Sequence, residues 1–306
     1  MALTEETGQE TSEFMRQLKA VAARLETRLE LILSDGFSAK DARLGEAMRY
    51  AVLGGGKRIR PFLLIESASL FAPPTDVVYD VAAALECVHC YSLVHDDLPA
   101  MDDDMLRRGR PTVHVAFGEA TAILAGDALL TLAFEILARP ETHESAEVRA
   151  ELIMGLARAA GWRGMVKGQA LDLAAEGADP TGEEIDRIQA LKTGQLIEFA
   201  CDAGAILGRA NGQQREALKT YAQALGRAFQ LADDLLDADG DESTLGKAAQ
   251  KDGAAGKATH VALLGVERAR EQLGELEGQA IGALAPFGDD AVILAEAARF
   301  VSRRTH

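Results

Sequence analysis

The sequence predicts an all-α protein, and three observations support this fold class. Alanine, the strongest helix former, is the most frequent residue, whereas aromatic side chains make up only 5% of the chain. Apolar residues recur at helical spacing, as at Phe14, Leu18, Val21 and Leu25, while strand-like alternation over six or more residues is hard to find. The interval 181–285 contains no proline and is long enough for several helices.

The composition is that of an ordinary globular protein. Of the 306 residues, 48% are hydrophobic and 26% are charged. No Gly/Ser-rich linker divides the chain, so residues 1–306 are expected to form a single domain, with the polar residues 1–13 frayed. The net charge of −16 would repel a polyanion, which argues against nucleic acid as a partner.

The three cysteines indicate neither a disulfide framework nor a zinc site. Cys87 and Cys90 form a CxxC pair, but Cys201 is the only other cysteine, so we expect small buried side chains on a helix. The acidic N-terminus lacks the apolar core of a signal peptide. No apolar run reaches the roughly 18 residues that a membrane span needs. We therefore expect a cytoplasmic protein without a membrane span.

Residues 81–95 form an apolar helix pattern that leads directly into an acidic cluster. This first cluster consists of Asp96, Asp97 and the aspartates 102–104. Carboxylates at the C-terminal end of a helix oppose its dipole. Taken alone, the segment could be a solvated acidic loop. A bound cation would relieve the repulsion, and Mg²⁺ typically takes one or two carboxylates together with substrate phosphates.

A second acidic cluster, Asp233, Asp234 and Asp237, follows another apolar helical stretch. Asp233 and Asp237 are four residues apart and project from one helix face, where like charges destabilise a helix. Two such clusters, each at the end of an apolar helix, predict one shared metal site between facing helices. An EF-hand is excluded, because Glu242 and Ala248 occupy the positions that need glycine and glutamate.

Two other segments complete the helix assignment. Ile185, Ile188, Leu191 and Leu196 form a second apolar stripe, which predicts a helix. The Gly-rich, polar segment 238–258 has no such stripe and is expected to be a mobile loop between helices.

A cluster of cations follows a run of three glycines at 54–56. Lys57, Arg58 and Arg60 could bind an anion that the glycine backbone approaches closely. The GxxxxGK[ST] spacing of a P-loop is absent. Alone, such a turn is usually a solvated surface.

The segment RRGRP at 107–111 repeats this chemistry directly after the first acidic cluster. Cations so close to aspartates suit a diphosphate that is bridged by a metal on one side and by guanidinium groups on the other. Lys192, Lys247 and Lys257 are further single cations. His89 lies two helical turns before Asp96 on the same face, so it is either a core residue or part of this site.

The motifs together resemble the trans (E-type) isoprenyl diphosphate synthases, specifically the bacterial short-chain type. The resemblance covers roughly residues 40–265. The matching segments, in family order, are GGKRIRP (55–61), SLVHDDLPAMDDDMLRRGRPT (92–112), FGEATAILAGDALL (117–130), GMVKGQALDL (164–173), KTG (192–194), FQLADDLLD (229–237) and TLGK (244–247). The resemblance implies the isoprenoid synthase fold, which is all-α with helices around a deep central cavity, and it implies a homodimer.

The resemblance also implies roles for single residues. The metal ligands would be Asp96, Asp102 and Asp233, with Asp97 and Asp237 as weaker ligands or outer groups. The allylic diphosphate would contact Arg107, Lys192 and Lys247. Isopentenyl diphosphate would be held by Lys57, Arg60, His89 and Arg108. Thr193 and Gln230 would place oxygen dipoles near the developing cation. Lys257, in GKAT where relatives often read GKST, would help to close a C-terminal lid.

The implied reaction condenses isopentenyl diphosphate with dimethylallyl or geranyl diphosphate to (2E,6E)-farnesyl diphosphate and diphosphate. Three Mg²⁺ ions, replaceable by Mn²⁺, and the cations would neutralise the leaving diphosphate, so that the allylic C1–O bond ionises. The isopentenyl alkene captures the cation, and an oxygen of the departing diphosphate takes the final proton. A dry cavity protects the cation from water.

Several other functions compete with this interpretation. A geranylgeranyl diphosphate synthase of the same family is the first alternative. A class I terpene cyclase usually carries a different second metal motif, and a regulatory subunit would lose the Asp motifs, which are both intact here. A metal phosphohydrolase built on His95 and Asp96 would release phosphate without isopentenyl diphosphate.

Product length is expected to depend on the residues before Asp96. Ser92 and Tyr91 precede it by four and five positions and lie one turn deeper along the helix. Serine would not block a growing chain, whereas tyrosine is bulky and rigid. In the resemblance, an aromatic residue at the fifth position is typical of C15 producers. The alternative is that Tyr91 only packs in the core.

Overall fold

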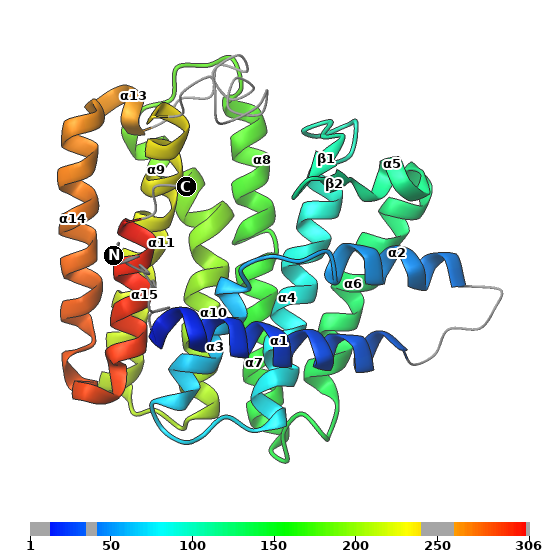
Figure 1. The fold of residues 1–306 in the computed structure, drawn as a ribbon, viewed down its shortest axis with the longest axis horizontal. Coiled ribbons are helices and arrows are strands. Elements are labelled where there is room, and N and C mark those ends of the chain that lie inside the picture. Colours follow the sequence, from blue (N-terminus) through cyan, green and yellow to red (C-terminus); the bar gives the residue numbers. More distant parts are fainter. Residues whose placement is uncertain (1–12, 35–41, 240–259, 304–306) are drawn as a thin grey trace, which may run out of the picture.

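Helices form nearly all of the structure, which confirms the predicted all-α class (Figure 1). The computed structural model describes residues 13–34, 42–239 and 260–303. Within these ranges the strands are limited to β1 (Leu106–Arg107) and β2 (Arg110–Pro111), an antiparallel hairpin of two residues per strand. This hairpin is formed by the RRGRP segment, which carries no strand signal in its sequence pattern.

The helical elements, in chain order, are α1 (Glu13–Ser34), α2 (Ala42–Val52), α3 (Ile59–Ser69), α4 (Asp76–Asp96), α5 (Val113–Phe117), α6 (Glu119–Ala138), α7 (Ala146–Ala160), α8 (Met165–Ala175), α9 (Gly182–Gln189), the π-helix η1 (Ala190–Gly194), α10 (Gln195–Leu207), α11 (Gly212–Asp239), α13 (His260–Leu264), α14 (Val266–Ala283), the 3₁₀-helix η2 (Ala285–Ala291) and α15 (Val292–Ser302).

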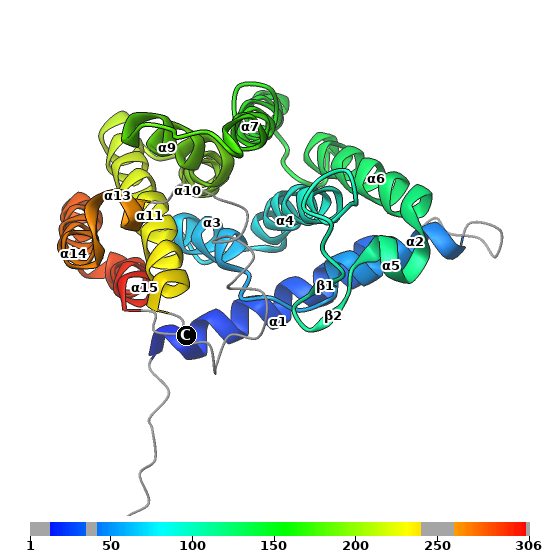
Figure 2. The ribbon, with the colours of Figure 1, turned by 90° about the horizontal axis from the view of Figure 1, so that it is seen from above.

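Helices α3 and α4 lie in the middle of the molecule (Figure 2). Helices α6, α7 and α10 cover one side of this pair, α1 and α2 cross the opposite side, and α11, α14 and α15 stand at one end. The central position explains the sequence of α4, in which every residue from 81 to 88 is buried, including Glu86. An all-apolar helix of this kind is expected where packing surrounds it on every side.

The predicted stripes are confirmed in outline. Phe14, Leu18, Val21 and Leu25 of α1 are all buried. In the second stripe, Ile185 and Leu196 are buried, but they belong to α9 and α10 with η1 between them. A π-helix adds one residue to a turn, and this accounts for the five-residue spacing from Leu191 to Leu196. Cys87 and Cys90 are buried on α4, as expected.

Two helices are long and apolar enough, by composition, to cross a membrane, although the sequence pattern suggested none. In α4, 78% of the apolar window is buried inside the protein, so this helix is explained as a core helix. In α6 only 39% is buried, which leaves apolar side chains at the surface. Most of the expected frayed residues 1–13 and of the expected loop 238–258 lie outside the described residues. Glu13 begins α1, and Asp239 ends α11.

Candidate active site

The first acidic cluster lies at the C-terminal end of α4. Asp96 is the last residue of the helix, and its carbonyl oxygen accepts a 2.9 Å hydrogen bond from the backbone N–H of Asp102, which folds the acidic loop back over the helix end. Burial raises the pKa of Asp96 to about 6; the nearby Lys192 opposes this shift and Asp102 adds to it. This end of α4 is therefore an unfavourable place for a carboxylate unless a cation is present.

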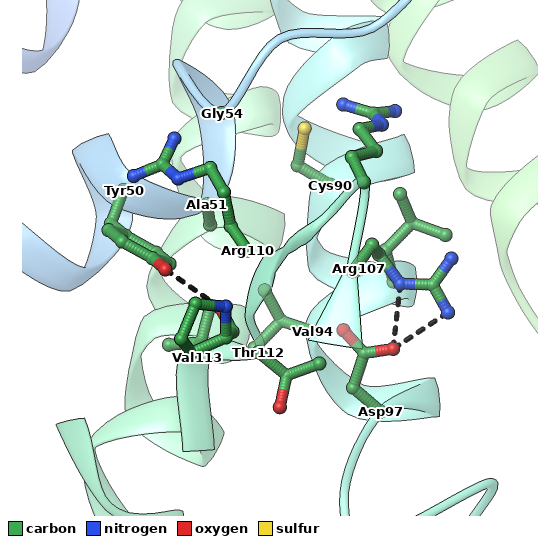
Figure 3. Close-up of a pocket in the computed structure, with 13 residues that line it drawn as sticks. Tyr50, Ala51, Gly54, Cys90, Val94, Asp97, Arg107, Arg110, Thr112 and Val113 are labelled. Carbon is green, nitrogen blue, oxygen red and sulfur yellow. Dashed lines mark hydrogen bonds and ion pairs between the residues drawn. The ribbon is translucent and has the colours of Figure 1, made fainter. Parts of the chain in front are cut away.

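Asp97 faces a guanidinium group on the hairpin (Figure 3). Asp97 is only 3% exposed, and its Oδ1 accepts a 2.7 Å hydrogen bond from Nε of Arg107, while Nη2 of the same guanidinium lies 2.7 Å from this oxygen. Nη2 of Arg107 also lies 3.7 Å from Asp104. Burial raises the pKa of Asp97 while Arg107 lowers it. The pair fixes the hairpin against the acidic loop.

The second acidic cluster occupies the C-terminal part of α11. Asp233 is partly buried, and its charge acts on Arg60, which lies at the start of α3. Asp234 is 6% exposed and accepts hydrogen bonds of 3.2 Å from the side-chain amides of Gln189 and Gln230. Burial raises its pKa, and these donors lower it. Asp237 belongs to α11, but its side chain lies outside the described residues.

The donor set of the two helix ends fits a hard divalent cation. The predicted ligands are carboxylate oxygens, which Mg²⁺ prefers, and a bound cation would oppose the rise in the pKa of Asp96 that burial causes. Among the described residues, no three metal-ligating side chains already form a cluster. Each helix would thus supply only one or two ligands, and substrate phosphates and water would supply the others.

The two basic segments come together at the N-terminal side of α3. Arg108 donates a short hydrogen bond to the carbonyl oxygen of Gly55. A Cβ atom on Gly56, whose φ is +133°, would lie 2.6 Å from the Arg108 guanidinium. The backbone conformation favours glycine at position 56, whereas the Arg108 guanidinium, at the end of a flexible side chain, could move away from a Cβ atom.

Arg60 and His89 lie in the same group. Nη1 of Arg60 is 3.4 Å from Nε2 of His89, and arginine can only donate, so Nε2 accepts. Burial, followed by the charges of Arg60 and Arg108, lowers the pKa of His89 well below its ordinary value. The imidazole is therefore neutral and keeps a donor at Nδ1. Lys57 is exposed, with its Nζ 5.6 Å from the ring centroid of Phe300 on α15.

Arg58, between Lys57 and Arg60, has a buried role that the sequence pattern did not reveal. Its φ of +50° is unusual for a residue with a side chain, and its guanidinium donates to Glu86 at 2.5 Å and to the carbonyl oxygen of Val52 at 2.6 Å. Glu26 of α1 lies 3.3 Å away. This buried ion pair ties the glycine-rich segment to three helices. The signal that could have found it is a lone glutamate within the apolar run of α4.

The π-helix η1 carries Lys192 and Thr193. Nζ of Lys192 is 2.6 Å from Asp172 of α8, another residue that sequence reasoning did not single out. Thr193 donates a 3.3 Å hydrogen bond to Oε1 of Gln230 on α11. A Cβ atom on Gly168 of α8 would lie 2.2 Å from the backbone nitrogen of Lys192. Only glycine at this position lets α8 approach η1 so closely.

Tyr91 and Ser92 lie one turn before the acidic end of α4. Tyr91 is buried, and its ring packs edge-on against His95 at 5.8 Å between centroids. Burial raises the pKa of its hydroxyl to about 12, with a smaller contribution from Asp96. Ser92 donates to the carbonyl oxygen of His89. His95 itself turns to α6, with its Nε2 3.1 Å from the carbonyl oxygen of Ile123.

A small cavity lies between α2, α4 and the hairpin (Figure 3). It holds about 50 Å³ and borders Asp97, Arg107 and Arg110, with Tyr50 below the Arg110 guanidinium. This volume suits ordered water but not a prenyl chain.

The described site residues thus form an arrangement with two groups of cations. One group comprises the cations Arg60 and Arg108 with the neutral His89 of α4, and Lys57 lies just before α3 in the sequence. The other comprises Lys192 and Arg107, whose charges both act on Asp96. Lys247 and Lys257 lie outside the described residues.

Comparison with known proteins places this geometry in a family. The polyprenyl synthetase model matches residues 41–283. The chain is 46% identical to a farnesyl diphosphate synthase of Escherichia coli over 86% of this chain and 89% of the relative. It is 42% identical to a chloroplastic geranylgeranyl pyrophosphate synthase of Catharanthus roseus over 86% of this chain and 74% of the relative. The apo crystal structure of an FPP/GFPP synthase from Zymomonas mobilis superposes with a TM-score of 0.86 at 45% identity, covering 94% of this chain and 98% of that one.

Proposed function

The chain belongs to the polyprenyl synthetase family, and we propose that it condenses isopentenyl diphosphate with dimethylallyl or geranyl diphosphate to give farnesyl diphosphate and diphosphate. One observation carries this proposal: the acidic clusters of α4 and α11 occur together with cations that act on Asp96 (Lys192 and Arg107) and with cations beside His89 (Arg60 and Arg108). Two anionic substrates can then be held side by side, one through metal and cations and the other through cations alone. The geranylgeranyl product is the alternative, because relatives with that name are also similar.

The metal would be Mg²⁺, with three ions per site, held by Asp96, Asp102 and Asp233 and by substrate oxygens. Bound there, it would neutralise the negative charge that develops on the leaving diphosphate. Lys192 and Arg107 act on the same charge. Asp172 holds Lys192 at 2.6 Å and Asp97 holds Arg107 at 2.7 Å, so both cations are positioned before the substrate arrives.

Ionisation of the allylic C1–O bond leaves a carbocation at C1. The hydroxyl of Thr193 and the amide oxygen of Gln230 supply dipoles beside it, and neither is a strong nucleophile that would capture it. Arg60, Arg108, Lys57 and the neutral His89 hold isopentenyl diphosphate, whose alkene electrons form the new C–C bond to C1. The resulting cation loses a proton to an oxygen of the departed diphosphate, which restores the double bond.

The working unit would be a homodimer that forms through α6. Ile123 and Leu124 on this helix are 44% and 57% exposed, although they lie on a strongly apolar segment. A second copy of the chain would cover this face. A cytoplasmic location remains our expectation, and the three free, buried thiols fit a reducing compartment.

The proposal is tested by substrate-specific kinetics. Arg108→Ala should raise KM for isopentenyl diphosphate, whereas Arg107→Ala should act mainly on the allylic substrate, each by roughly 10- to 150-fold for one lost charge-assisted contact. EDTA should abolish turnover in all forms. Equal effects of both variants on both substrates, or full activity in EDTA, would argue against the two-site, metal-dependent reaction.

A further inference from the structure

The second aspartate of the α11 cluster, Asp234, has no role in the reaction described above, yet it is among the most buried carboxylates of the described chain. It is 6% exposed and lies beside Asp233. Its two oxygens accept from different side chains: Oδ1 from Nε2 of Gln230 and Oδ2 from Nε2 of Gln189, both at 3.2 Å. The backbone N–H of His260, where the chain returns into α13, also donates to it. All three partners are donors, which suits an ionised carboxylate.

The contacts on either side of Gln230 leave its amide only one orientation. An ionised carboxylate can only accept, so the NH₂ group of Gln230 must face Asp234. The amide oxygen then points the opposite way, where it accepts the 3.3 Å hydrogen bond from Thr193. Turning the amide over would bring two oxygens together at Asp234 and would cost the Thr193 contact as well.

Asp234 acts on η1 through a second connection. Gln189 immediately precedes η1, the π-helix that carries Lys192 and Thr193. Asp234 is buried and binds both Gln189, at the start of this π-helix, and Gln230 on α11. Burying a carboxylate costs free energy, and well-placed hydrogen-bond donors are needed to offset this cost.

We propose that Asp234 is a positioning residue that fixes the amide oxygen of Gln230, and through it the hydroxyl of Thr193, toward the reacting carbon. This inference rests on the proposed function, because it assigns Asp234 to the carbocation step and not to metal or diphosphate binding. Loss of the carboxylate should then lower kcat while leaving both KM values nearly unchanged.

A charge swap between positions 230 and 234 tests the proposal. Asp234→Asn lets the Gln230 amide turn over, and we expect kcat to fall roughly 10- to 100-fold with KM for both substrates within about threefold. Gln230→Glu alone places two carboxylates against each other and should also lose activity. When both substitutions are combined, the new amide at position 234 can donate to the new carboxylate at position 230, so the melting temperature should rise above that of Gln230→Glu, whereas kcat stays low because a carboxylate can capture the carbocation. Asp202→Asn is the matched control, because Asp202 pairs with Arg215 near the start of α11, far along the helix from Asp234.

The outcomes separate the inference from the proposed function. A double variant with a melting temperature no higher than that of Gln230→Glu, or an unchanged kcat in Asp234→Asn, would overturn the positioning role. Melting temperatures of all four variants show whether a loss follows stability instead of chemistry. Absence of turnover in the wild type would contradict the proposed function alone. The pairing of Gln230 with Asp234 can then be tested by the side-chain amide signals of ¹⁵N-glutamine-labelled protein. The Gln230 signal should shift in Asp234→Asn and stay unchanged in Asp202→Asn.

Discussion

His89 is a single side chain that couples the stability of the fold to pH. Burial and the neighbouring arginines hold its folded-state pKa well below 6.5. The unfolded chain therefore binds more protons than the folded one below about pH 6.5, and the free energy of unfolding falls as the pH decreases through this window. Above that pH both states carry a neutral ring, so the penalty disappears.

We expect His89→Gln to flatten this acid limb. The variant cannot take up the proton, so its stability should decline less between pH 6.5 and 5, by up to about 1.4 kcal/mol per pH unit. Urea unfolding at several pH values measures the difference. His143, which is near the surface before α7, provides the control in His143→Gln. Parallel pH profiles of wild type and His89→Gln would show that His89 is protonated normally.

Among the helical elements, the contact between α8 and η1 positions Lys192. Gly168→Ala would place a Cβ atom 2.2 Å from the backbone nitrogen of Lys192, so one of the two helices must move. Because Lys192 is held by Asp172 on that same α8, we expect a higher KM for the allylic substrate and a kcat lowered at least tenfold. Gly278→Ala on α14 meets nothing within 4 Å and should retain full activity with equal or greater stability. Equal kinetics of Gly168→Ala and wild type would show that this close approach does not matter.

The elements also show what a sequence pattern can and cannot predict. The apolar runs that lead to Asp96 and to the Asp233 cluster are local patterns and predict helices there. The helix α4 ends at Asp96 as expected, whereas α11 continues past the second cluster to Asp239. The π-helix η1 does not follow from such patterns, because an extra residue in one turn is decided by packing against Gly168 and Gln230 and not by periodicity. The pairing of Arg58 with Glu86 joins two residues that are close only after folding, so the lone glutamate in the apolar run of α4 indicates a buried partner without identifying it.

For the molecule as a whole, we predict that two copies of the chain associate through the exposed apolar face of α6. Leu124→Glu places a charge at the centre of the proposed dimer contact and should give a monomer in light scattering coupled to size exclusion. Leu31→Glu changes an equally exposed leucine on α1, which is 59% exposed, and should remain dimeric. A wild type that is monomeric at micromolar concentration, or a dimer that survives Leu124→Glu, would contradict assembly through α6. Activity of a monomeric variant would further show whether the site needs its partner, because His95, next to Asp96, binds the backbone of Ile123 on this helix.

The identity of the product bears most directly on the proposed prenyl transfer. Purified protein is incubated with Mg²⁺, labelled isopentenyl diphosphate and each allylic primer in turn, and the products are separated by chain length. We expect a C15 product from dimethylallyl and geranyl diphosphate, with Tyr91→Ala shifting it to C20 or longer because the buried ring no longer limits the chain. No elongation with any primer, or release of phosphate without isopentenyl diphosphate, would contradict prenyl transfer; a C20 product from the wild type would contradict the role given to Tyr91.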